Sequence, residues 1–265
     1  MLYSCAMFAS EDEALDAAQE RKLDMICRKL RLQPGEKLLE IGCGWGGLII
    51  HAAQHYGVDA RGITLSQPQA DLANERIAAA GLADRCRADV CDYRELKEIA
   101  AYDKLVSIGM VEHVGTENLS QYFDAAWRLL KPGGVMLNHG IGDTSQRPAK
   151  TNRGFIRVYV FPDSDLPPIT TILGAAEASG FEPRDLESLR EHYTMTLRHW
   201  TDRLRAHQQE AIEEVGERTY RVWRLYMAAS AHWFAKGFIS VYQALLVKPH
   251  NGQSGMPLLR EDWYR

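Results

Sequence analysis

The stretch that decides the fold is Leu38-Leu39-Glu40-Ile41-Gly42-Cys43-Gly44-Trp45-Gly46-Gly47, a short apolar run followed by closely spaced glycines. Glycines at the end of a strand let the backbone turn sharply and approach a ligand closely. Residues 46–56 continue with a helical pattern, and the first N–H groups of that helix would face the same crevice. Nicotinamide and flavin sites also use such turns, but the GxGxxG pattern does not have its usual form here, because Gly42, Gly44 and Gly46 are followed directly by Gly47. The stretch therefore predicts a ligand-binding turn between a strand and a helix.

Strand and helix patterns alternate from residue 37 to residue 137. We predict strands at 37–41, 59–63, 104–108 and from 135 onward, a further strand ending near Asp89, and helices at 46–56, 68–80 and 119–130. Residues 131–134, Lys-Pro-Gly-Gly, predict a helix stop and a turn. This alternation is typical of a parallel sheet covered by helices on both faces, which binds ligands at the carboxyl edge of its strands.

The alternation breaks after His139. Residues 140–168 are rich in Gly, Pro, Asp and Ser and predict an inserted loop. A helix at 169–179, a strand at 182–189, a long helical stretch at 193–236 and a closing strand at 238–247 follow. We interpret residues 1–265 as a single α/β domain in which two insertions, about 140–168 and 193–236, form a lid over the carboxyl edge of the sheet.

Composition excludes several functional classes. The chain has 265 residues, is 46% hydrophobic and carries a net charge of −4, which suits a globular protein and not a dedicated nucleic-acid binder. Its apolar runs fall far short of the ~18 residues that span a bilayer. The first residues lack the basic and apolar regions of a signal peptide, so we expect a cytoplasmic protein. The five cysteines form no CxxC pair, and we expect no metal site.

The ends of the second and third strands narrow the choice of cofactor. Thr64 stands where a nicotinamide enzyme would carry an acid for the ribose diol, which argues against a nicotinamide cofactor. Asp92 falls just after the third strand, where it suits a contact to an adenine edge. A solvated loop acid or a helix cap is the alternative interpretation of Asp92.

Seven motifs together point to a family. An acid directly before GxGxG, as at Glu40, resembles motif I of the S-adenosylmethionine-dependent methyltransferases. The full set resembles the cyclopropane fatty acid synthases and mycolic acid methyltransferases, over essentially the whole chain. The motifs are Tyr3-Ser4-Cys5-Ala6, residues 38–47, residues 62–69, Asp92-Tyr93-Arg94, residues 107–115, Tyr159-Val160-Phe161-Pro162 and residues 192–197. The resemblance implies a Rossmann-like class I methyltransferase fold with a mostly parallel seven-stranded sheet.

The resemblance also implies a reaction and a site. A methyl group passes from S-adenosylmethionine to the cis double bond of an unsaturated fatty acyl chain of a phospholipid, and loss of a proton closes a cyclopropane ring. The cofactor positions that match are Tyr3, Ser4, Glu40, Gly42, Gly44, Gly46, Thr64, Leu65, Gln69, Cys91, Asp92 and Ile108. The family holds a bicarbonate ion as the base, and the matching catalytic positions are Glu112, His139, the backbone of Ile141, Tyr193 and Ser230. Ser230 stands where the family usually has a cysteine.

We expect the lipid to be reached by peripheral contact with the inner membrane surface. The basic residues proposed for that contact are Arg147, Lys150, Arg153 and Arg157. The lid aromatics proposed to stabilise a cation are Tyr159, Phe161, Trp200, Tyr226, Trp233 and Phe234. Family members carry a segment before Tyr3, so the chain is expected to be a fragment or to have a more open cofactor pocket. A homodimer, a methyl-branched lipid product, a small amine substrate and a non-catalytic family member stay open as alternatives.

Overall fold

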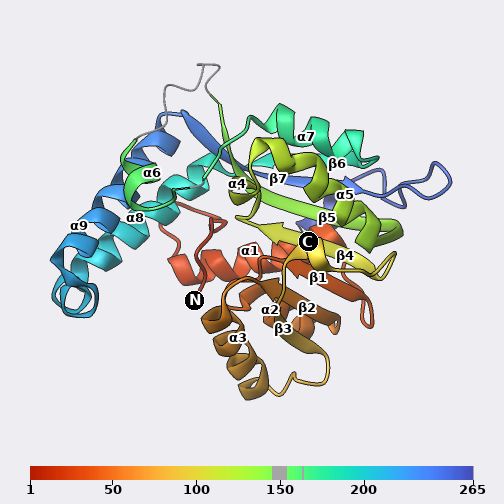
Figure 1. The fold of residues 1–265 in the computed structure, drawn as a ribbon, viewed down its shortest axis with the longest axis horizontal. Coiled ribbons are helices and arrows are strands. Elements are labelled where there is room, and N and C mark those ends of the chain that lie inside the picture. The colour runs from red at the N-terminus through yellow and green to blue at the C-terminus, as the bar shows by residue number, and fades with distance from the viewer. Residues whose placement is uncertain (145–153, 163, 265) are drawn as a thin grey trace.

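A seven-stranded sheet forms the centre of the protein, with strand order β3-β2-β1-β4-β5-β7-β6 (Figure 1). The computed structural model describes residues 1–144, 154–162 and 164–264. The strands are β1 (Lys37–Ile41), β2 (Asp59–Thr64), β3 (Cys86–Val90), β4 (Tyr102–Ile108), β5 (Leu130–Asp143), β6 (Glu182–Ser188) and β7 (Ile239–Val247). Only β7 runs antiparallel to its neighbours, β5 and β6. This is the class I methyltransferase fold, and the predicted mostly parallel sheet is confirmed.

Helices cover both faces of the sheet. They are α1 (Leu15–Leu30), α2 (Gly47–Tyr56), α3 (Gln67–Ala79), α4 (Val111–Val114), α5 (Leu119–Leu129), α6 (Phe155–Tyr159), α7 (Ile169–Ala178), α8 (Arg190–Ala206) and α9 (Gln208–Ala235). Side chains of one strand alternate between the faces, so Leu38 packs in the core with α1, α2 and α3, whereas Leu39 packs in the core with α5 and α7. The same alternation sends Leu137 of β5 to the α1 face and Met136 to the α5 face.

Two predictions about elements were wrong. The strand β5 spans residues 130–143, so it includes the predicted turn at 131–134 and the first residues of the predicted loop at 140–168. Pairing with β7 holds that segment extended as far as Asp143 opposite Ile239. Gly140 serves there as a point of close packing and not as a loop residue, because a Cβ at Gly140 would lie 2.2 Å from Cγ1 of Val111.

Helix α1 was not predicted from the sequence. Its buried face includes Gln19, Lys22 and Lys29 beside apolar residues, and these polar side chains obscure the amphipathic pattern. The predicted long helical stretch at 193–236 is confirmed as α8 and α9, which pack against each other. In Figure 1, α6, α8 and α9 lie together at one end of the molecule. Within the described ranges, no helix has the length and apolar character needed to cross a membrane.

Candidate active site

A cavity of about 900 Å³ lies at the carboxyl edge of the parallel strands. Most residues predicted to bind a cofactor line it: Tyr3, Ser4, Glu40, Gly42, Gly44, Thr64, Leu65, Gln69, Cys91, Asp92 and Ile108. Four of the predicted catalytic residues line the same cavity: Glu112, Ile141, Tyr193 and Ser230. We call the part formed after β1, β2 and β3 the loop end, and the part formed by α4, α8 and α9 the lid end. Two predicted residues, Gly46 and His139, are not among the described residues that line the cavity.

The glycine loop after β1 has the tight backbone that its sequence predicts. Gly42, Gly44 and Gly46 have φ values of +81°, +53° and +80°, a region that favours glycine. A Cβ on Gly44 would meet no heavy atom within 4 Å, so Gly44 borders open space. A Cβ on Gly46 would lie 2.9 Å from Cβ of Ala73. Gly46 therefore allows α2 to pack closely on α3 and is not among the described residues that line the cavity, so its contact with the cofactor stays a prediction.

A buried pair of opposite charges supports the loop end. Glu40 is almost fully buried and Lys22 of α1 is fully buried. Burial raises the pKa of Glu40 to about 8, against the opposing charge of Lys22. Burial likewise lowers the pKa of Lys22 to about 8, against the charge of Glu40. The Lys22 ammonium donates to Oγ of Ser4 at 2.9 Å, so it ties the N-terminal segment to α1. The sequence analysis missed Lys22, whose only signal was its place among apolar residues of a helix.

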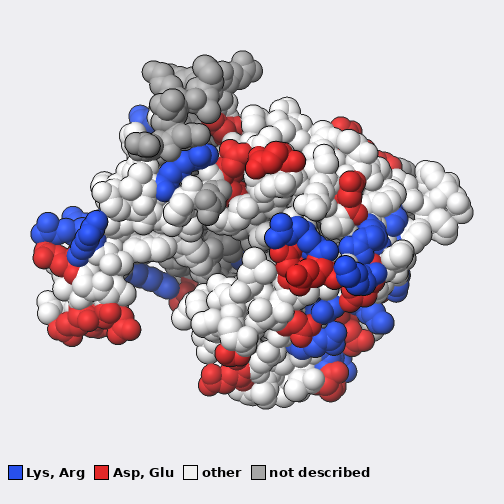
Figure 2. All heavy atoms as spheres, viewed as in Figure 1, with Lys and Arg blue, Asp and Glu red and all other residues white. Residues whose placement is uncertain are grey.

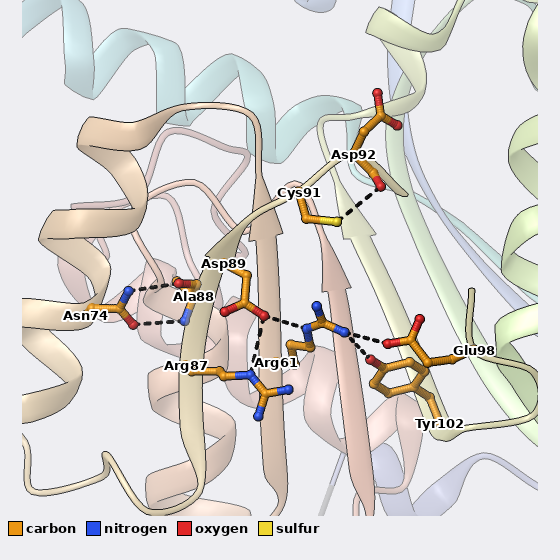
Figure 3. A network of polar contacts seen from close by, with 9 residues as sticks. All are labelled: Arg61, Asn74, Arg87, Ala88, Asp89, Cys91, Asp92, Glu98 and Tyr102. Atoms are coloured by element: carbon orange, nitrogen blue, oxygen red, sulfur yellow. Dashed lines mark hydrogen bonds and ion pairs between the residues drawn. The ribbon is translucent and has the colours of Figure 1, made fainter. Parts of the chain in front are cut away.

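A polar network fixes the loop that follows β3 (Figure 3). Arg61 of β2 donates from Nε to Oδ2 of Asp89 at 2.6 Å and from Nη1 to Oε1 of Glu98 at 2.8 Å (Figure 3). The Asn74 amide pairs with both backbone groups of Ala88, at 2.8 and 2.9 Å, and so satisfies this part of an edge strand. The chain then leaves β3 in a fixed direction, which brings Cys91 and Asp92 to the cavity.

Asp92 combines two of the roles considered for it. Its Oδ1 accepts the backbone N–H of Arg94 at 2.9 Å and so caps the short helix at Tyr93–Glu95. Hydrogen bonds from Arg94 lower the pKa of Asp92, although partial burial opposes that shift. A carboxylate that stays ionised and lines the cavity is available to accept hydrogen bonds from a ligand.

Thr64 and Gln69 form a hydrogen-bonded pair on the same side of the loop end. Thr64 Oγ1 lies 2.8 Å from Oε1 of Gln69 and accepts the Ser66 N–H at 3.2 Å. These hydrogen bonds fix the backbone at the end of β2. At this place the sequence lacks the acid of a nicotinamide site. Both residues line the cavity, as predicted.

Glu112 is the central residue of the lid end. It lies in α4, just after β4, and is only 5% exposed. Its Oε1 accepts the backbone N–H of Ile141 at 2.7 Å, whereas Oε2 is buried without a partner among the described residues. Burial raises the pKa of Glu112 to about 7. The Ile141 amide was predicted as a donor to an anion, but it already donates to Glu112 and instead fixes that carboxyl group.

Tyr193 and Ser230 reach the lid end from α8 and α9, and both are buried. His139 does not share this wall. It follows the alternation of β5 to the α1 face, and its Nδ1 lies 3.2 Å from Nε2 of Gln243. Burial, together with the charges of Lys22 and Lys29, lowers the pKa of His139 to about 3. The structure therefore places Glu112, Tyr193 and Ser230 around one cavity, whereas His139 is not among its described lining residues.

Aromatic side chains line much of the lid end. Of the six that were predicted, Phe161, Tyr226, Trp233 and Phe234 line the cavity. Tyr159 is instead 52% exposed, and Trp200 stacks on Tyr3 with ring centroids 5.0 Å apart. The hydroxyl of Tyr3 also donates to that of Tyr226 at 3.4 Å. The N-terminal segment is thereby fixed against α8 and α9, a long-range contact that local sequence patterns do not encode.

Comparison with known proteins identifies relatives of this cavity and fold. The family model described as mycolic acid cyclopropane synthetase matches residues 1–244. A probable fatty acid methyltransferase of Pseudomonas putida is 45% identical over 269 residues, which cover 100% of this chain and 68% of that protein. The cyclopropane-fatty-acyl-phospholipid synthase of Escherichia coli K12 is 37% identical over 245 residues, which cover 92% of this chain and 62% of that protein.

Solved structures agree with these matches. The cyclopropane synthase of Mycobacterium tuberculosis superposes with a TM-score of 0.87 at 33% identity and covers 92% of this chain and 89% of that one. A mycolic acid cyclopropane synthase complexed with SAH and CTAB gives a TM-score of 0.85 at 34% identity, again over 92% of this chain and 89% of that one. Sequence and fold agree over nearly the whole length of this chain, and the chain belongs to the mycolic acid cyclopropane synthetase family of methyltransferases.

Proposed function

We propose that this chain transfers a methyl group from S-adenosylmethionine to the cis double bond of an unsaturated fatty acyl chain of a phospholipid and closes a cyclopropane ring. The observation that carries the proposal is that the glycine loop and the buried carboxyl group of Glu112 border one cavity. A methyl donor at the loop end and an alkene at the lid end would then meet inside the protein. The similarity to a probable fatty acid methyltransferase of Pseudomonas putida and to the cyclopropane-fatty-acyl-phospholipid synthase of Escherichia coli supports this proposal.

The residues of the loop end fit S-adenosylmethionine. Gly44 borders open space, so a ligand can approach its backbone closely. Asp92 accepts hydrogen bonds there, and the buried Oε2 of Glu40 has no partner among the described residues, so it is free for a ligand donor. The SAH complex of a related cyclopropane synthase supports a cofactor of this class.

The residues of the lid end fit a small anion that carries its own hydroxyl group, and we propose bicarbonate. The buried Oε2 of Glu112 lacks a donor, which such a hydroxyl would supply. The hydroxyl groups of Tyr193 and Ser230 would donate to the other oxygens of the anion. When bound at the loop end, S-adenosylmethionine would supply an electrophilic methyl group. Bicarbonate at the lid end would supply a base for the ring-closing proton.

The chain's own contribution is alignment and exclusion of water. An alkene needs no deprotonation before it attacks, so the protein has to hold the double bond beside the methyl donor in a dry pocket. Phe161, Tyr226 and Trp233 line the lid end, and their ring faces would stabilise a carbocation on the acyl chain. Glu112, kept in place by the Ile141 amide, orients the base and not the alkene.

We also propose that the enzyme takes its lipid from the inner, cytoplasmic surface of the membrane by peripheral contact through α6. Three of the four basic residues first considered, Arg147, Lys150 and Arg153, lie outside the described residues. The fourth, Arg157 of α6, lies 3.8 Å from Asp165. Next to it, Val158 and Tyr159 are 53% and 52% exposed, and Ile156 of the same helix lines the cavity. In Figure 2, Lys and Arg side chains lie over α6 and over part of α9, whereas Asp and Glu side chains gather where α8 and α9 meet.

The membrane proposal is tested with vesicles of anionic unsaturated phospholipid at low salt. Tyr159→Glu places a negative charge at the proposed contact and is expected to weaken vesicle binding by about fivefold or more. Leu186→Glu is the matched control, since Leu186 is 44% exposed on the edge strand β6, far from α6 in Figure 1. Equal binding by the two variants would exclude α6 as the contact.

The catalytic proposal is tested by methyl transfer from labelled S-adenosylmethionine to vesicles. Label is expected in phospholipids with cis-unsaturated acyl chains and not in saturated ones of the same headgroup. Label in both lipids would indicate a headgroup amine as the acceptor. No label in either lipid, with S-adenosylmethionine bound normally, would support a non-catalytic family member.

A further inference from the structure

A row of buried polar side chains crosses three strands on the α1 face of the sheet. His139 of β5 lies directly opposite Gln243 of β7, and Gln243 lies directly opposite Glu187 of β6. Lys29 of α1 packs over this row. His139, Gln243 and Lys29 are each at most 2% exposed. Buried polar groups cost free energy unless their hydrogen bonds are satisfied. Each donor in the row is therefore expected to face an acceptor.

The contacts in the row fix the direction of each hydrogen bond. The Lys29 ammonium, which can only donate, lies 2.7 Å from Oε1 of Gln243 and also contacts the carboxylate of Glu187. The amide oxygen of Gln243 therefore faces Lys29, and its NH₂ group faces His139. The Gln243 Nε2 lies 3.2 Å from Nδ1 of His139. Because an amide NH₂ can only donate, Nδ1 must present its lone pair, and the ring proton must be on Nε2.

We infer that Gln243 and Lys29 are positioning residues that hold His139 in a single neutral tautomer, with its proton on Nε2. Only the expected effect on turnover rests on the proposed function. In that function, a fixed Nε2–H of His139 would keep the hydrogen bonds near Glu112 and Tyr193 in one arrangement. A purely structural ion pair of Lys29 and Glu187 would not need this arrangement, since it would be satisfied without Gln243 and His139. The low pKa of His139, caused by burial and two lysine charges, agrees with a neutral ring.

The tautomer is measured directly by nitrogen NMR of the full chain labelled at histidine. His139→Gln identifies the signals of this ring among the nine histidines. In the wild-type protein at neutral pH, we expect Nδ1 to resonate as an unprotonated nitrogen and Nε2 as a protonated one. A proton on Nδ1, or rapid averaging between both nitrogens, would overturn the inference. The NMR measurement needs no enzymatic activity, so the tautomer of His139 can be determined even if the proposed function is wrong.

Substitution of Gln243 tests the direction of control. Gln243→Glu keeps the shape of the side chain, but a carboxylate accepts from both neighbours and should move the His139 proton to Nδ1. Lys29→Met should leave the amide free to flip and give a mixture of tautomers. If both variants keep the wild-type tautomer, the row does not control His139. Folding of each variant is verified by its unchanged affinity for S-adenosylhomocysteine at the loop end.

The consequence for turnover has its own control. Gln243→Glu should lower kcat by about ten- to a hundredfold, the usual cost of losing an outer-shell orienting group, with little change in KM for S-adenosylmethionine. Glu187→Gln keeps a side-chain oxygen that can accept from Lys29 and leaves the Gln243 to His139 hydrogen bond in place, so kcat should stay close to that of the wild type. An unchanged kcat in Gln243→Glu, with the tautomer switched, would show that His139 does not take part in the reaction.

Discussion

The loop end and the lid end of the cavity are built in different ways. At the loop end, Gly42 and Gly44 come from one short motif, and Thr64, Cys91 and Asp92 lie at or just after the ends of the next two strands. At the lid end, Glu112, Tyr193 and Ser230 come from three helices, and α4 is far from the consecutive helices α8 and α9 in the sequence. A ligand at the loop end meets mainly backbone and small polar groups, whereas the lid end offers a buried carboxyl group among aromatic rings. We therefore expect variants of the two ends to fail differently, in cofactor binding or in turnover.

The largest effect is expected for Glu112→Gln. Loss of one group that orients the base in a buried site should cost about 2–4 kcal/mol of barrier, a rate lower by about 10²–10³. Methyl transfer to unsaturated lipid measures the loss, and calorimetry with S-adenosylhomocysteine should give a nearly unchanged affinity. Wild-type turnover in this variant would remove Glu112 from the mechanism.

The same substitution should raise the free energy of unfolding, although it lowers the rate of methyl transfer. The pKa of Glu112 is raised from 4.5 to about 7 in the folded protein, so ionisation of this group opposes folding. The favourable contribution of the protonated Glu112 to the free energy of unfolding is fully present below pH 4.5 and is lost as the pH rises through about 7. Glu112→Gln does not titrate, so above that range it should exceed the wild type in free energy of unfolding by about 3 kcal/mol. Denaturant unfolding from pH 4.5 to 8 measures this difference, while the titration of Glu40, present in both proteins, largely cancels.

A smaller effect separates two glycines of one loop. Gly44→Val and Gly46→Val both place a branched residue at positive φ, but only the second meets a neighbour, Ala73. Gly46→Val should therefore lower the free energy of unfolding by about 1–3 kcal/mol more than Gly44→Val does. Gly44→Val should instead abolish cofactor binding, because its side chain points into the cavity. If Gly44→Val binds S-adenosylhomocysteine with wild-type affinity, the cofactor does not sit on this loop.

The sequence predicted the loop end well because its residues follow strands that local patterns reveal. Strand order then brings Thr64 and Asp92 beside the glycine loop without any long-range information. The packing of Gly46 on Ala73 was not predicted, because spacing alone does not tell a glycine that meets a ligand from one that lets two helices pack. Helix α1 was missed because Lys22 and Lys29 interrupt its apolar face.

The lid end depended on the family resemblance. Nothing local in the sequence places Tyr193 and Glu112 at the same cavity, since β5 and β6 lie between α4 and α8 along the chain. The sequence also could not show which face of β5 His139 occupies, because that depends on the register of β5 with β7. The contact between Tyr3 and Tyr226 joins residues 223 positions apart, and the Lys22 to Ser4 bond depends on an unpredicted helix. These long-range contacts arise only when the whole chain packs.

The most direct test of the account follows the fate of the transferred methyl group. The protein is incubated with S-adenosylmethionine carrying a trideuterated methyl group and with vesicles of phospholipid containing cis-monounsaturated acyl chains, and the lipids are analysed by mass spectrometry. We predict products that gain one carbon and two deuterium atoms per reacted double bond, because closing the ring releases the third deuteron to a base. Retention of all three deuterium atoms on the acyl chain would mean a methyl branch in place of a ring and would contradict the proposed reaction.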